Sequence, residues 1–132
     1  MNRALGDREK AMVAAARLAA HYVDAAIKAG VDEDEISGVL HKVASELTNV
    51  EFWITDENGR IILGCHHMDF IFPDDPDAGS QAAPFASLLD GTETMVVQEP
   101  QPRELDGMVF QYVGVPGVDQ PRIVQMGVPV GG

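Results

Sequence analysis

Small and apolar residues recur at three- and four-residue steps between residues 7 and 29, which predicts one long helix. The stripe consists of Met12, Ala15, Ala16, Ala19, Tyr22, Val23, Ala26 and Ile27. Gly30 is well placed to end this helix, because glycine readily adopts the left-handed conformation that closes many helices. Alanine permits the close approach of another element, and two partners are open at this point. The stripe could pack on the chain's own sheet, or on the same helix of a second copy in a dimer.

The acidic run that begins at Asp32 predicts the start of a second helix. The Asp32 carboxylate can accept hydrogen bonds from backbone N–H groups of the first turn, and Glu35 has the spacing of a capping box. Thr48-Asn49 should end the helix. The side chains that we expect to face the core are Ile36, Val39, Leu40, Val43 and Leu47.

From residue 50 the pattern changes from helical spacing to short runs of β-branched and aromatic residues. Two such runs flank Asp56-Glu57-Asn58-Gly59. Asn-Gly supplies the positive φ angles that a tight reversal needs, so residues 50–64 are predicted to form a β-hairpin.

A loop, a short helix and three strands are expected after the hairpin. Prolines and acidic residues mark residues 65–79 as a loop, and its aromatic side chains predict that it folds back over a pocket or the core. The short helix should lie between Ser80 and Asp90, with Phe85, Leu88 and Leu89 turned inward.

The three strands are expected at residues 94–98, 108–115 and 122–128. Pro116-Gly117 fits a type II turn between the last two, with proline fixing φ and glycine taking the positive φ. Short connections favour antiparallel pairing. The fold class is therefore α+β, with helices packed on one antiparallel sheet.

Composition narrows the range of partners. The 132 residues suit a single domain, and 21 acidic against 9 basic residues give a net charge of −12. Such a surface repels phosphate backbones and anionic lipids, so nucleic acid is not an expected partner. Cys65 is the only cysteine, which excludes an intramolecular disulfide. No run approaches the roughly 20 apolar residues of a membrane span, and the first residues are too polar for a signal peptide.

Several blocks of the sequence resemble the Cache/PAS-like sensor domains of bacterial chemoreceptors (methyl-accepting chemotaxis proteins), sensor kinases and cyclic-dinucleotide enzymes. The hairpin Glu51–Ile61 is similar to the "WITDxxGxI" hairpin of such sensors. The other blocks are Phe70-Ile71-Phe72-Pro73, Gly79-Ser80-Gln81, Tyr112-Val113-Gly114-Val115 and Pro121–Gly127.

The resemblance implies a five-stranded antiparallel sheet with two N-terminal helices and one short helix between strands two and three. It also implies sensing rather than catalysis, a ligand pocket in front of the sheet, and a homodimer formed through the N-terminal helix. The whole chain, 1–132, would be one sensor-like domain, with residues 1–30 as the N-terminal helix and 31–128 as the core. As given, the chain is expected to be cytoplasmic, although an excised extracytoplasmic sensor domain would look the same.

A small ligand, for which a carboxylate is one candidate, would be held by residues from the strands and the loop. Arg103 and Arg122 could clamp a carboxylate with bidentate hydrogen bonds. The full candidate set is Trp53, His67, Phe70, Gln81, Arg103, Tyr112, Arg122 and Gln125. Two members have simpler interpretations: Trp53 as a core residue and Arg122 as a solvated charge at a strand edge.

Other chemistry is poorly supported. His66 and His67 follow Cys65 and offer the right atoms for zinc or haem, but adjacent side chains at a strand end point apart. The acidic turn Asp74–Asp77 lacks the glycine and glutamate of an EF-hand. No serine has the Gly-x-Ser-x-Gly setting, and a neighbouring Cys–His pair rarely has catalytic geometry. We therefore expect no cofactor, no metal and no enzymatic activity.

The leading hypothesis is a small-molecule-binding sensor domain in which ligand binding changes helix packing in a dimer. The main alternative is a ligand-free PAS-like scaffold or interaction module, and a haem or metal sensor through His66 or His67 is the third. Packing distinguishes the first two. A sheet face filled by Phe70, Phe72, Phe85 and Tyr112 would leave no room for a ligand.

Overall fold

The computed structural model describes residues 4–47 and 49–131. In chain order the elements are α1 (Asp7–Lys28), α2 (Glu33–Ser45), β1 (Glu51–Thr55), β2 (Ile61–Gly64), η1 (Ala83–Leu88), β3 (Val96–Val97), β4 (Gln101–Pro102), β5 (Val109–Pro116) and β6 (Ile123–Pro129). The strands form one antiparallel sheet in the order β2-β1-β6-β5-β3, and β4 also pairs with β5. The predicted α+β class and the two N-terminal helices on an antiparallel sheet are confirmed.

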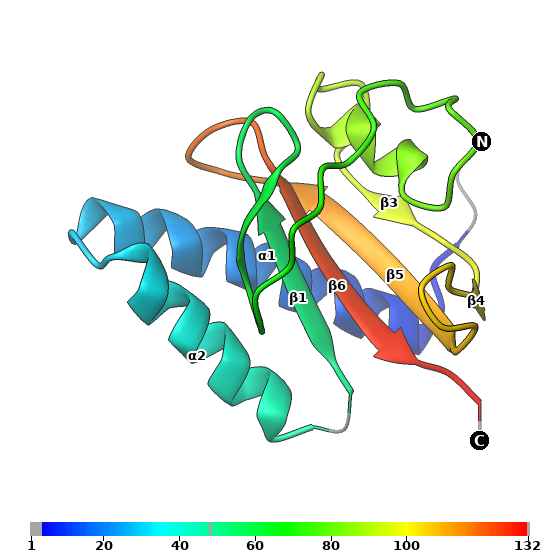
Figure 1. Ribbon diagram of the computed structural model, residues 1–132, viewed down its shortest axis with the longest axis horizontal. Coiled ribbons are helices and arrows are strands. Elements are labelled where there is room, and N and C mark those ends of the chain that lie inside the picture. The colour runs from blue at the N-terminus through cyan, green and yellow to red at the C-terminus, as the bar shows by residue number, and fades with distance from the viewer. Residues whose placement is uncertain (1–3, 48, 132) are drawn as a thin grey trace.

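Figure 1 shows α1 crossing behind the sheet, with η1 and the loop after β2 in front of it. This arrangement follows from side-chain alternation along the strands, which sends successive residues to opposite faces. On β5, Gln111 bonds to α1 residues, whereas its neighbour Tyr112 and then Gly114 lie on the face that carries η1. The sheet therefore separates a helix-covered face from a loop-covered one.

Both helices begin where the sequence predicts. The backbone N–H of Gly6 donates to Glu9 Oε1 at 3.0 Å at the start of α1, and Glu35 N–H donates to Asp32 Oδ1 at 2.9 Å at the start of α2. Gly30 has the positive φ of 81° that separates the two helices. The acidic first turns also complement the helix dipoles.

The alanine stripe of α1 packs against the chain's own sheet. Ala16, Ala19, Ala20 and Ala26 are all buried in the core that α1 forms with β5 and β6. Alanine allows the helix axis to come close to the strands. This stripe is therefore not an open dimer seam, and any contact between copies must use another surface.

The predicted buried face of α2 is too wide. Ile36, Leu40 and Ala44 are buried, but Val39 and Val43 are each 43% exposed and Leu47 is 54% exposed. The reason is the position of α2, which packs mainly on β2 at the edge of the sheet and so has only a narrow contact stripe. The helix ends at Ser45, earlier than expected, and of the predicted stop residues Thr48 lies outside the described residues.

The hairpin turn is confirmed, with Gly59 at φ 83° and the Asp56 carboxylate accepting from the N–H groups of Asn58 and Arg60. The type II turn at Pro116-Gly117 is wrong, because Gly117 does not take a positive φ. Glycine is needed there for space instead: a Cβ on Gly117 would lie 2.4 Å from Cγ of Arg122.

The later elements are shorter than expected. Only Val96–Val97 of the predicted strand 94–98 pairs in the sheet, and the short helix is a 3-10 helix, Ala83–Leu88. Phe85 and Leu88 are buried in a second core with Phe72 and Ile123. This small core fixes η1 over one end of the open sheet face, and the rest of that face stays uncovered by helices.

Candidate functional site: a cavity over the open sheet face

A cavity of about 460 Å³ lies between the open face of the sheet and the segments that cross it. Its floor comes from β1, β5 and β6, through Trp53, Tyr112 and Gln125. Its walls come from the loop after β2, from η1, and from residues 98–105. The loop is held there by backbone hydrogen bonds, because Ile61 N–H donates to Phe70 O at 2.9 Å and Phe72 N–H donates to Gly59 O at 2.8 Å.

Two glycines make room for the aromatic side chains of the floor, and each lies on the strand next to that of its aromatic partner. Trp53 pairs across the sheet with Gly64, and Tyr112 pairs with Gly127. A Cβ on Gly64 would lie 2.7 Å from the Trp53 ring, and one on Gly127 would lie 2.3 Å from the Tyr112 ring. Each ring therefore lies flat over a glycine, and this geometry leaves space above the sheet.

The most organised polar group in the cavity is the carboxylate of Glu51, which sequence reasoning missed. The Trp53 indole N–H and the Tyr112 hydroxyl each donate to Glu51 Oε1 at 3.0 Å. Arg103 Nη1 donates to Glu51 Oε2 at 2.7 Å. Three predicted ligand-binding residues thus converge, but they converge on a side chain of the protein itself.

Arg103 is held from several sides. Its Nε and Nη2 form a bidentate pair with Asp106 at 2.8 and 2.7 Å, and its guanidinium stacks 4.1 Å from the centre of the Phe110 ring. The hydrogen bonds that Arg103 donates to Asp106, together with the one that it donates to Glu51, keep the pKa of Arg103 above its ordinary value. Conversely, the hydrogen bonds from Arg103 lower the pKa of Asp106 to about 2. Arg103 is therefore a permanently charged and already paired group.

Tyr112 links this cluster to the cavity floor. Burial is the main reason that its pKa is raised to about 12, and the nearby negative charge of Glu51 acts in the same direction. The hydroxyl is therefore protonated at neutral pH and acts as a hydrogen-bond donor to Glu51.

The two predicted glutamines have different roles. Gln81 fixes the wall segment, because its amide donates to Pro102 O at 2.7 Å and accepts from Glu104 N–H at 3.1 Å. Gln125 lines the floor on β6, opposite Trp53, and is only 6% exposed. Its side-chain amide has no hydrogen-bond partner within the described residues. It is a buried polar group that faces the cavity.

Arg122 and His67 do not line this cavity. Arg122 is 3% exposed, and its guanidinium donates to Thr55 O and to Asp119, both at 3.1 Å. It is therefore neither a ligand clamp in this cavity nor a solvated edge charge, because it tethers β1 to the connection that precedes β6. Phe70 does line the cavity, from the loop.

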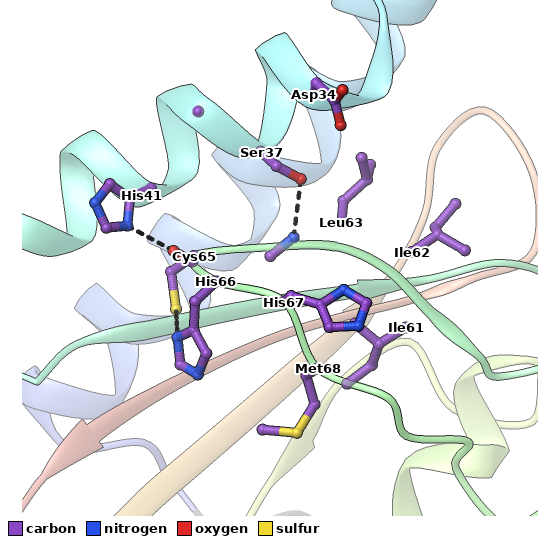
Figure 2. A pocket seen from close by; sticks show the side chains of 12 residues that line it. Asp34, Ser37, His41, Ile61, Ile62, Leu63, Cys65, His66, His67 and Met68 are labelled. Atoms are coloured by element: carbon purple, nitrogen blue, oxygen red, sulfur yellow. Dashed lines mark hydrogen bonds between the residues drawn. The ribbon is translucent and has the colours of Figure 1, made fainter.

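His67 lies instead at a second cavity, of about 360 Å³, between α2 and β2. Figure 2 shows His41 of α2 above Cys65, with His41 Nδ1 2.7 Å from Cys65 O, and Ser37 Oγ accepting from Gly64 N–H at 3.3 Å. The ring of His66 is turned to the Cys65 sulfur, with Nδ1 3.5 Å from Sγ. The contacts of Ser37 and His41 anchor α2 to the end of β2.

Neither metal binding nor thiol chemistry gains support from this second cavity. Among residues 4–47 and 49–131, no group of three or more His, Cys, Asp or Glu side chains is arranged to hold a metal ion. Burial raises the pKa of the Cys65 thiol, which disfavours the nucleophilic thiolate.

Comparisons with known proteins were made by sequence and by structure. No protein-family model matches the sequence, and no curated protein matches it. A solved structure of a Cache chemosensory domain, described for its recognition of a carboxylic acid, superposes with a TM-score of 0.57. The match covers 94% of this chain and 94% of that chain, at 16% sequence identity. The chain has a Cache fold. The resemblance predicted from the hairpin and the strand motifs is thus confirmed at the level of fold.

On this Cache fold, the cavity lies on the sheet face opposite α1, where the resemblance places a ligand pocket. Within the described ranges, no helix is long and apolar enough to cross a membrane. The remaining question is what the cavity can hold.

Proposed function

We propose that this chain is the ligand-binding domain of a sensor and takes a small organic molecule into the cavity over the sheet. The main observation that supports the proposal is the open volume of the cavity. Phe70, Phe72, Phe85 and Tyr112 all border the cavity, and about 460 Å³ remains between them. Small-molecule sites typically enclose roughly 300–1,000 Å³, lined mainly by apolar groups with a few fixed polar ones.

The same observation argues against a ligand-free scaffold, whose sheet face would be filled by those aromatic side chains. The solved Cache domain that recognises a carboxylic acid supports ligand binding as a role of this fold. Binding rather than catalysis is favoured because the buried Cys65 thiol is not activated and the charged side chains of Glu51 and Arg103 are engaged with each other.

We also propose that α1 carries the signal away from the cavity. Gln111 on β5 donates to Glu9 Oε2 at 2.8 Å and accepts from Arg8 Nε at 2.9 Å. The next residue, Tyr112, borders the cavity on the other face of the sheet. A ligand that shifts Tyr112 would move the same strand that holds the first turn of α1, and α1 is the element through which a dimer is expected.

The experiment is a thermal-shift screen with amines, amino acids, carboxylates, purines and pyrimidines. A compound at ~100 times its dissociation constant should add about 2.7 kcal/mol, which raises the melting temperature by several degrees. Ala82→Phe tests the location, because Ala82 lines the cavity and a phenyl group would fill part of it. Ala25→Phe, at an exposed position of α1, is the matched control.

The proposal predicts at least one stabilising compound whose effect disappears in Ala82→Phe and persists in Ala25→Phe. A screen in which no compound of any class raises the melting temperature would overturn it. So would a compound that stabilises both variants equally, because its site would then lie outside this cavity.

A further inference from the structure

The hydrogen-bond donors of the cluster around Glu51, which are the strongest candidates to receive a carboxylate in this cavity, are already engaged. Every guanidinium nitrogen of Arg103 bonds to Glu51, Tyr112 or Asp106. The Tyr112 hydroxyl and the Trp53 indole N–H both donate to Glu51. Glu51 therefore occupies, from within the chain, the place that a ligand's carboxylate would take among these groups.

Hydrogen-bond acceptors, by contrast, remain available. The carboxylate of Glu104 borders the cavity and has no hydrogen-bond or ion-pair partner within the described part of the chain. The amide of Gln125, more than nine-tenths buried in the floor, is likewise unpartnered there. This amide offers an acceptor oxygen and a donor NH2 group to a ligand in the cavity.

The charges point the same way. Glu51 and Asp106 both pair with the guanidinium of Arg103, Glu104 adds a further carboxylate at the cavity, and the whole chain carries a net charge of −12. An incoming carboxylate would lie near the carboxylates of Glu51 and Glu104. Arg103 is the only arginine or lysine among the described residues that line the cavity, and it is already paired, so the charge of a ligand carboxylate would be poorly compensated. An ammonium group brings three donors and a positive charge, and aromatic faces such as those of Trp53 and Phe70 attract cations.

We infer that the ligand of this cavity is a small organic amine, bound as its ammonium form with an apolar body against the aromatic walls, and that the cavity excludes carboxylates. The inference rests on the proposed function and names its ligand class. The ammonium takes its partners from the open acceptors, the Glu104 carboxylate and the Gln125 amide oxygen. This revises the sequence-based expectation of a carboxylate ligand.

The test uses calorimetric titration of the full chain with matched probes. Alkyl and arylalkyl amines, from ethylamine to 2-phenylethylamine, are each compared with the amide and the carboxylate that carry the same apolar body. The best amine should bind about tenfold more tightly than its amide, as expected for a charge-assisted hydrogen bond. Its carboxylate partner should show no saturable binding.

Two variants locate the effect. Glu104→Gln should weaken the best amine about tenfold without changing the binding of the amide, and Glu93→Gln, at an exposed position elsewhere, should change neither. Glu51→Gln keeps an acceptor for Tyr112 and Trp53 but removes the internal anion from Arg103. It should gain carboxylate binding, and circular dichroism would verify that it is folded.

Several outcomes would overturn the inference. Wild-type protein that binds a carboxylate but no amine would refute the ligand class and leave the proposed function standing. Amide and amine binding of equal strength would show that the charge is not recognised. Amine binding that survives both Glu104→Gln and Ala82→Phe would place the site elsewhere. If no compound of any class bound in this titration or in the thermal screen, the proposed function would be refuted as well.

Discussion

At the scale of single residues, the cavity is organised by Glu51, the first residue of β1. An acidic residue at the start of a strand normally indicates an exposed edge, so its sequence position gave no sign of a buried role. Its partners were more predictable. Trp53, Arg103 and Tyr112 were each expected at the pocket from their residue types and positions, and their side chains meet at the carboxylate of Glu51.

The role of Arg122, by contrast, could not be predicted from the sequence. Its position before a strand is compatible with a solvated charge or a ligand clamp, and the sequence alone cannot choose. Only the fold brings the Thr55 carbonyl, the Asp119 carboxylate and the bare backbone of Gly117 around its side chain. The contact with Thr55 joins residues 67 positions apart in the sequence, and it depends on β1 and β6 becoming neighbours in the sheet.

The raised pKa of Tyr112 predicts a loss of stability at high pH. The tyrosine hydroxyl titrates near 10 in an unfolded chain and at about 12 here, so the folded state binds the extra proton between these values. Stability is therefore retained below pH 10 and falls as the pH rises towards 12. Urea unfolding of wild type and Tyr112→Phe across this range would test it. A wild-type slope that is unchanged in Tyr112→Phe would contradict the assignment.

At the scale of elements, glycine positions on the strands decide how the aromatic rings lie. Gly127→Ala should destabilise the protein by about 1–3 kcal/mol, because the new Cβ would overlap the Tyr112 ring. Gly38→Ala, in the middle of α2 where no atom lies within 4 Å of the new Cβ, should instead stabilise it by roughly 0.5–1 kcal/mol. Urea titration of both variants measures the change in unfolding free energy, which should be a loss for Gly127→Ala and a gain for Gly38→Ala. Equal effects would contradict the packing described for Tyr112.

The second helix shows how far hydrophobic spacing can predict burial. The spacing located α2 and its buried residues Ile36 and Leu40, but it could not reveal that α2 lies at the sheet edge and covers little of it. We expect Leu40→Ala to cost about 2–5 kcal/mol of unfolding free energy, as for a fully buried leucine.

Val43→Ala, on the exposed side of the same helix, should stay within about 0.5 kcal/mol of wild type. The pair of variants is compared by urea unfolding. A large loss in Val43→Ala would mean that another surface, such as a second copy of the chain, covers this face in solution.

At the scale of the whole molecule, the dimer remains a prediction from the family resemblance. The alanine stripe cannot test it, because Ala16 and Ala19 are core residues and a charge there would unfold the chain. Leu18 is 71% exposed on the outer side of α1, so Leu18→Glu leaves the core intact. If α1 forms the dimer contact, sedimentation velocity should give a dimer for wild type and for Val39→Glu, and a monomer for Leu18→Glu. A wild-type monomer at all concentrations would refute it.

The fold class and the family resemblance could be predicted from the sequence because the local signals along the chain agreed. Caps, the Asn-Gly turn and strand-like runs all pointed to the same order of elements. The volume of the cavity above the sheet could not be predicted from the sequence, because it depends on two glycine–aromatic pairs and on the path of a loop.

The strand order carries a consequence for how the protein is made. β6 lies in the middle of the sheet, hydrogen-bonded to β1 on one side and β5 on the other, yet it follows both in the sequence. While a ribosome is still synthesising the chain before Ile123, β1 and β5 each have an unpaired inner edge, and the floor of the cavity lacks its central strand. The sheet and its binding site are therefore completed together, when the last strand is inserted, and until then both exposed edges are open to mispairing.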